Sequence, residues 1–370
     1  MSFKLFYFGL HWLFYHSQSL KESMVMEIRV ISEKKEFKKI QTDWVNLFIL
    51  GEYSVFQSFE FNYYSWESEL SKNKRNTLCI VLLGNKDMLL AILPLYIDSR
   101  KRLRFINDKH ADFCDFLVND VFDFEVILFE IRKQVLYTSV HLINLKEDSF
   151  VYDFYKKLDI KNGYIRSFEK YSDLVLSGGV FPDNYDRYKS KNKAVFRRVK
   201  RKNNDKSYCL LSKDKGAFPI REVTILKERM IRLGLRSPDF LNDNRLILLE
   251  ELFDSDKLLI SMIRKDMEIY AISFILKNAD EYLFWISLFD NIKMIHIYNY
   301  ISFMEKVSGN NKVKISFGRG AYGYKVINFK PDVKQLFAVF IFSNTLQKAA
   351  FLFFEKIRTT IKLIYKSFTT

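Results

Sequence analysis

Two carboxylates lie three residues apart in the segment 110–115, His-Ala-Asp-Phe-Cys-Asp. In a tight loop Asp112 and Asp115 would both face one cleft, where a carboxylate can bind a substrate or act as a general base. Alternatively, one of them caps the following turn while the other faces water. A divalent metal held by both and by His110 is a third arrangement. The five histidines and three cysteines are scattered, however, so we predict no metal site.

A strongly basic segment spans residues 187–206. Ten lysines and arginines there are opposed only by Asp205. Such runs are typical of solvated faces or nucleic-acid contacts. The planar guanidinium groups of Arg197 and Arg198 match phosphate oxygens, so we predict that they bind the phosphates of a coenzyme, a nucleotide sugar or tRNA.

Glycines follow the apolar segment 313–317 at three positions, Gly318, Gly320 and Gly323. They allow the chain to turn sharply and to approach a ligand closely. Arg319 and Lys325 then become candidates to bind a carboxylate or phosphate, and Tyr324 becomes a candidate proton donor. The alternative is a glycine-rich connection with exposed cations. Both interpretations predict a bend.

The elements that must position these residues are interleaved helices and strands. In the first part, helical spacing covers 34–50, 59–70, 120–135 and 150–158, and strands are predicted at 78–83, 88–96, 103–106, 140–145 and 164–176. Ser177-Gly178-Gly179 and Pro182 mark a boundary. In the second part we predict helices at 185–202, 221–233, 244–253 and 293–307, and strands at 258–264, 268–277, 281–288 and 313–317.

The last thirty residues predict an amphipathic helix. Its apolar stripe comprises Leu346, Ala350, Phe353, Ile357, Ile361, Ile364 and Phe368, and its cations lie off that stripe. The helix either packs on the protein or contacts an anionic membrane surface.

Composition sets the wider limits. A chain of 370 residues with 48% hydrophobic residues predicts two folded domains with a tail. The net charge of +15 draws in anions without selecting one. Cysteines without a pairing pattern favour a reducing cytoplasm. Residues 1–23 carry an apolar run that is too short to span a bilayer, and we predict a non-essential extension, with membrane anchoring as the alternative.

Four stretches together resemble the cellulose-biosynthesis type of acetyltransferase in the GNAT superfamily, which is related to Fem-type transferases. Residues 55–61 with Trp66 resemble its phenylalanine-glutamine-serine opening, and 111–116 resemble its paired-aspartate loop. Residues 190–201 resemble its basic helix, and 316–325 its closing Gly-Arg-Gly and Tyr-Lys signature. In order and spacing these stretches cover residues 25–335.

The resemblance implies an α/β (α+β) protein of two tandem GNAT-like halves, residues 24–180 and 181–335. Each half would be a mixed, largely antiparallel sheet flanked by helices, followed by an amphipathic basic tail at 336–370. It also implies an acyl-CoA donor, such as acetyl-CoA, and an amine acceptor on a sugar or cell-envelope polysaccharide precursor. The amine would attack the activated acyl carbon while a base removes its proton.

Residue roles also follow from the resemblance. Asp112, Asp115, Tyr324 and Lys325 would be catalytic, with Tyr324 returning a proton to the leaving thiolate. The donor would be bound by Lys193, Arg197, Arg198 and Arg319, although Lys193 stands where the family has an arginine.

The expected donor loop departs from the family pattern. The donor's pyrophosphate would lie at the helix N-terminus near residues 288–293. That segment has no glycine-rich turn, and it carries Asp290 at the expected cap. We interpret His296, in the helix that follows, as a packed histidine.

Three other functions stay open. A Fem-like transferase would use aminoacyl-tRNA, with the basic helix as a salt-sensitive tRNA contact. A non-catalytic protein would keep the fold without the donor site, and a dedicated nucleic-acid-binding module is the last option. We expect a cytoplasmic protein, peripheral at the inner face of the membrane if the last helix binds lipid.

Overall fold

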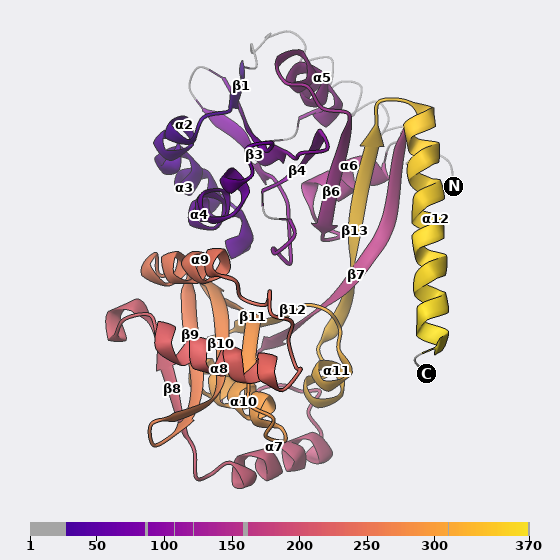
Figure 1. Ribbon diagram of the computed structural model, residues 1–370. Coiled ribbons are helices and arrows are strands. Elements are labelled where there is room, and N and C mark those ends of the chain that lie inside the picture. Colours follow the sequence, from indigo (N-terminus) through magenta and orange to yellow (C-terminus); the bar gives the residue numbers. More distant parts are fainter. Residues whose placement is uncertain are drawn as a thin grey trace, which may run out of the picture.

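The computed structural model describes residues 27–85, 88–106, 108–120, 122–157, 162–309 and 311–368. The predicted extension at residues 1–23 lies outside this part of the chain. Two sets of elements follow one another in nearly the same order (Figure 1). The first set comprises β1 (Glu27–Ile31), α2 (Lys34–Lys39), α3 (Gln41–Leu50), α4 (Phe59–Ser68), β2 (Thr77–Gly84), β3 (Leu89–Ile97), β4 (Arg102–Phe105), β5 (Leu117–Val118), α5 (Phe124–Gln134), β6 (Ser139–Leu145), α6 (Phe150–Lys156) and β7 (Gly163–Leu176).

The second set begins with an additional helix, α7 (Ser190–Lys202). It continues with β8 (Ser207–Leu211), α8 (Ile220–Arg232), α9 (Asp243–Asp254), β9 (Leu258–Lys265), β10 (Glu268–Asn278), β11 (Glu281–Phe289), α10 (Ile295–Val307), β12 (Val313–Arg319), α11 (Gly323–Phe329) and β13 (Asp332–Phe342). A last helix, α12 (Thr345–Phe368), ends the described chain.

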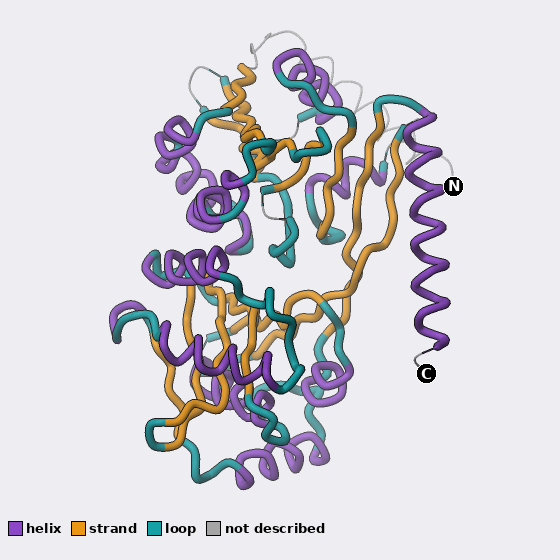
Figure 2. The backbone as a smooth tube through the Cα atoms, in the orientation of Figure 1, coloured by secondary structure: helices purple, strands orange, loops and turns teal. Residues whose placement is uncertain are grey.

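The strands form one mixed sheet in the order β1-β2-β3-β4-β6-β13-β7-β12-β11-β10-β9-β8, with β5 on β3. The pairs β4/β6 and β11/β12 are parallel, and the other pairs are antiparallel. The two final strands are exchanged between the halves. β7, from the first half, pairs with β12, whereas β13, from the second half, pairs with β6. β7 and β13 also pair with each other, so the sheet is continuous through its middle (Figure 2).

The observed architecture confirms the predicted fold class, a mixed α/β protein whose sheet is flanked by helices. The end of the second half, predicted at residue 335, lies within β13. The segment Leu336–Phe342 is rich in aromatic and β-branched residues, which suit a buried strand, and the helix begins only at Thr345.

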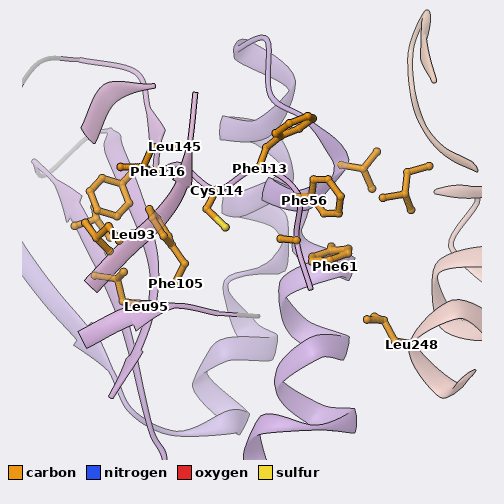
Figure 3. Close-up of a cluster of buried hydrophobic side chains, with 14 of the residues drawn as sticks. Phe56, Phe61, Leu93, Leu95, Phe105, Phe113, Cys114, Phe116, Leu145 and Leu248 are labelled. Carbon is orange, nitrogen blue, oxygen red and sulfur yellow. The ribbon is translucent and has the colours of Figure 1, made fainter. Parts of the chain in front are cut away.

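Both halves contribute to one apolar core. Figure 3 shows Phe56, Phe61 and Phe113 of the first half on one side of this core, with Leu248 of α9 approaching from the second half. Trp285 of β11 completes the contact, because its ring centroid lies 5.9 Å from that of Phe56 and 5.5 Å from that of Phe61. This shared packing fixes the side chains at the junction of the halves. No helix within the described ranges is long and apolar enough to cross a bilayer.

Candidate active site between the two halves

Asp112 joins the two halves directly. Its carboxylate is buried, and Oδ2 accepts a hydrogen bond of 3.0 Å from the backbone N–H of Arg319, at the end of β12. The preceding residue, Gly318, has a φ of +65°, and a Cβ there would overlap Oδ2 of Asp112. Glycine is therefore required both by the backbone conformation and by the close approach of the carboxylate.

The Arg319 side chain extends the same network into the first half. Its Nη1 donates to Oδ1 of Asn144 at 3.2 Å, and its Nε lies 3.5 Å from a carboxylate oxygen of Glu169. Asn144, near the end of β6, also donates to the carbonyls of Asp108 and Ala111. One buried asparagine thus holds the loop that carries Asp112 and accepts from the arginine of the opposite half.

Lys325 is the second cation of this site. It lies in the first turn of α11 with its side chain buried, and its Nζ donates to the carbonyl of Phe317 at 2.5 Å. Burial lowers the pKa of Lys325 to about 8, although the negative charge of Asp112 opposes the shift. Burial also raises the pKa of Asp112, against the positive charge of Arg319. A buried amine that titrates close to neutral pH is suited to proton transfer.

Arg245 is a buried cation that our sequence analysis missed. It lies in the first turn of α9 with its guanidinium carbon 4.4 Å from the ring centroid of Trp285, and its Nη1 has no hydrogen-bond partner in the described structure. Burial lowers its pKa to about 9, opposed by the charges of Glu69 and Asp112. The signal was its spacing, because Arg245 shares one helix face with Leu248, Leu249 and Leu252.

His110 does not join the two aspartates. Its Nε2 lies 3.0 Å from Glu69, and this contact lowers the pKa of the glutamate. Burial lowers the pKa of His110 itself, despite the glutamate. The backbone carbonyl of His110 accepts from the indole N–H of Trp285 at 3.1 Å, which ties the loop to β11.

Asp115 and Asp112 have different hydrogen-bond partners. Its two oxygens accept from the backbone N–H groups of Phe116 and of Phe150, the first residue of α6. Burial raises the pKa of Asp115 to about 7, and the residue lines a separate pocket of about 300 Å³ with Tyr53 and Lys146. The structure therefore does not bring the two aspartates into one cleft.

Tyr324 and Lys325 are adjacent but contact different neighbours. The Tyr324 ring packs on His296 at a centroid distance of 4.9 Å, and its hydroxyl is hydrogen-bonded to Tyr300 of α10. Burial raises the pKa of Tyr324. His296 is packed, as expected from the sequence, and burial lowers its pKa to about 4.

The strands β11 and β12 diverge beside Tyr300 of α10, and we call the place where they diverge the fork. β11 and β12 pair only at residues 281–283 with 314–316, whereas β12 pairs with β7 from Val313 to Arg319. α10 starts behind the fork with Met294 at its N-cap, in the left-handed region, and no side chain caps its free N–H groups. The prediction that Asp290 caps this helix is wrong, because Asp290 pairs with Arg229 of α8 at 2.7 Å. The helix N-terminus thus has no acidic residue in its first turn.

The other predicted donor ligands lie on α7. Lys193 pairs with Asp183 at 2.6 Å, and Arg197 and Arg198 are exposed. The buried face of the helix packs through Phe196 onto Phe329 of α11. No contact between these three cations and Arg319 is found in the described ranges. Of the predicted site residues, Asp112, Arg319 and Lys325 lie together, and Tyr324 lies at the fork.

No protein-family model matches the chain, and no curated protein sequence matches it significantly. Among solved structures it is similar to the C-terminal DUF2156 domain of a candidate lysylphosphatidylglycerol synthetase from Agrobacterium fabrum, with 10% identity, a TM-score of 0.54 and coverage of 87% of this chain and 95% of that one. It is also similar to L-PGS from Bacillus licheniformis, with 10% identity, a TM-score of 0.52 and coverage of 87% and 96%. FemX gives 8% identity, a TM-score of 0.52 and coverage of 84% and 96%.

The fold is a tandem GNAT-like fold. At these identities the likeness shows the fold alone. The predicted pair of GNAT-like halves is therefore confirmed, while the narrower resemblance to the cellulose-biosynthesis type stays a prediction.

Proposed function

We propose that this tandem GNAT-like protein is an acyl-CoA-dependent N-acyltransferase whose acceptor is an amine of a sugar or cell-envelope polysaccharide precursor. The observation that carries the proposal is a buried lysine with a lowered pKa, Lys325, beside the Asp112–Arg319 contact and one residue from Tyr324 at the fork between β11 and β12. Proton-transfer groups thus lie close to the point where β11 and β12 cease to pair.

The N-terminus of α10 fits the phosphates of acyl-CoA. No side chain caps its first turn, although the N–H of Ile295 donates to the carbonyl of Ile292. The turn has no acid, and Arg229 neutralises Asp290. Free N–H groups and the helix dipole favour anions at this position. When bound, acyl-CoA would supply an activated acyl carbon.

The remaining chemistry falls to side chains of this chain. Lys325, with a pKa of about 8, can take up a proton from an attacking amine at Nζ when it is neutral. Asp112 holds the backbone of Arg319 and favours the charged form of Lys325 after that transfer. The Tyr324 hydroxyl, whose pKa is raised by burial, stays protonated and can donate to a leaving thiolate.

Calorimetry with coenzyme A and acetyl-CoA tests the donor site. The decisive variant is Met294→Asp, because aspartate tolerates the left-handed conformation of Met294 and its charge repels a phosphate. The matched control is Met294→Asn, which tolerates the same conformation and has nearly the same shape without a charge. We expect the wild type and Met294→Asn to bind both compounds, and Met294→Asp to bind at least about tenfold more weakly, or about 1.4 kcal/mol. Absence of binding, or equal binding by the two variants, would contradict the assignment.

A second candidate uses aminoacyl-tRNA as the donor. It is favoured by the exposed cations of α7 and by the structural similarity to FemX. In that case tRNA binding should fall steeply with added salt. It should also weaken in Arg197→Ala/Arg198→Ala, whereas coenzyme A should not bind.

A further inference from the structure

Helix α12 packs on the protein through one narrow face. Phe351 contacts the rings of Phe340, Phe342 and His141, at centroid distances of 4.7, 5.1 and 5.7 Å. One turn later, Glu355 forms an ion pair with Arg166 of β7. Figure 1 shows α12 alongside β13 and β7 at the edge of the molecule. The predicted packing on the protein is therefore present, but it does not use the apolar stripe.

The apolar stripe lies on a different face of the helix. The exposed fractions of its side chains are 80% for Leu346, 61% for Phe353, 67% for the adjacent Phe354, 40% for Ile357 and 50% for Ile361. At 3.6 residues per turn these positions fall within a sector of about 100°, centred about 130° around the helix from the direction midway between Phe351 and Glu355. The stripe runs for about 22 Å along the helix. Four turns of one helix thus present large apolar side chains to solvent.

The charges around the stripe favour an anionic partner. Lys356 and Arg358 lie on its two flanks, at helical positions on either side of Ile357. The one acidic residue in the sequence of α12, Glu355, pairs with Arg166 of β7 and, at 3.3 Å, with Arg358 of its own helix. The outward face therefore combines apolar side chains with cations and carries no acid. The whole chain also has a net charge of +15.

We propose that α12 docks on the surface of a bilayer that contains anionic lipids. The stripe would lie among the acyl chains near the headgroups, while Lys356 and Arg358 contact lipid phosphates. A second copy of the chain fits the face less well, because it would present the same positive charge. The proposal does not depend on the proposed reaction.

Sedimentation with vesicles tests this docking. The full chain is mixed with vesicles of phosphatidylcholine alone, or with vesicles containing phosphatidylglycerol as well. We expect at least tenfold stronger partitioning to the anionic vesicles, weakened by salt. Phe353→Asn/Ile357→Asn should lower partitioning at least tenfold. Both side chains face solvent, so the thermal midpoint should be unchanged. Ile49→Asn/Leu50→Asn is the matched control, since those residues of α3 are 72% and 71% exposed.

Two outcomes would overturn the proposal. The first is equal partitioning of the wild type and the α12 double variant, or no partitioning at all. The second is a dimer in light scattering that only the α12 substitutions convert to a monomer, because the stripe would then be a contact between copies. Lys356→Glu/Arg358→Glu separates the electrostatic contribution to docking from the apolar one, because it should remove the preference for phosphatidylglycerol.

Discussion

Replacing Gly318 by alanine tests whether the two halves meet as described. The residue has a φ of +65°, and an alanine Cβ would overlap the Asp112 carboxylate that accepts the backbone N–H of Arg319. The substitution therefore strains the backbone and displaces the carboxylate. Both effects should lower the free energy of unfolding.

The backbone strain and the lost hydrogen bond can be measured separately by comparing substitutions at two glycines of this chain. A left-handed conformation costs a non-glycine residue about 1–2 kcal/mol. Displacing the carboxylate leaves the N–H of Arg319 without its partner, which costs about a further 1–3 kcal/mol. Gly318→Ala should thus destabilise by about 2–5 kcal/mol. Gly234→Ala is the matched control, because Gly234 has a φ of +69° and an added Cβ would meet no atom within 4 Å, so the substitution should cost only about 1–2 kcal/mol.

Denaturant unfolding of Gly318→Ala in the wild-type and the Asp112→Ala backgrounds completes the test. With Asp112→Ala already present, Gly318→Ala should cost no more than Gly234→Ala does, because the carboxylate is gone. The coupling between positions 112 and 318 should therefore be about 1–3 kcal/mol. Equal costs of Gly318→Ala in the two backgrounds would refute the close approach of Asp112 to β12.

Three further predictions concern buried charges. The pKa of Asp115 is raised from 3.8 to about 7, so between these values the folded chain keeps a proton that the unfolded chain loses. The free energy of unfolding should fall by about 4 kcal/mol over this range relative to Asp115→Asn, and parallel pH profiles would argue against it. The pKa of Lys325 is lowered from 10.5 to about 8, so wild-type stability should rise by about 3 kcal/mol across that interval relative to Lys325→Met, as measured by denaturation. Arg245→Met keeps the packing on Trp285 without an incompletely paired charge; it should leave stability unchanged or higher, and a loss above about 2 kcal/mol would contradict this.

The sequence predicted the halves but not the exchange of their last strands. β13 has an apolar run at Leu336–Phe342, whereas β7 mixes apolar and charged residues, and neither pattern identifies the strand beside it. β7 is 14 residues long, so its first part pairs with β13 and its last part with β12. Pairing of this kind is decided by packing across the sheet, which local periodicity does not report.

The sequence predicted the part of the site in which a glycine required by the backbone stands next to charged residues. Gly318 and the cations beside it pointed to a close approach, and Asp112 is the group that approaches. Asp115 has the same residue type, but the N-terminus of α6 takes up its carboxylate instead. Arg245 was not predicted because a cation at the start of a helix ordinarily faces solvent, although its spacing places it on the apolar face of α9.

Because the last strands are exchanged, the site depends on residues from both halves of the sheet. Lys325 lies on α11, which leads directly into β13, and β13 pairs with β6, whose Asn144 accepts from Arg319. The same asparagine holds the loop of Asp112 through the carbonyl of Ala111. The cations of the second half are thus positioned by a strand that belongs to the sheet of the first. A second half alone would keep α11 but lose β6, Asn144 and Asp112, and Lys325 would be left without the carboxylate that favours its charged form.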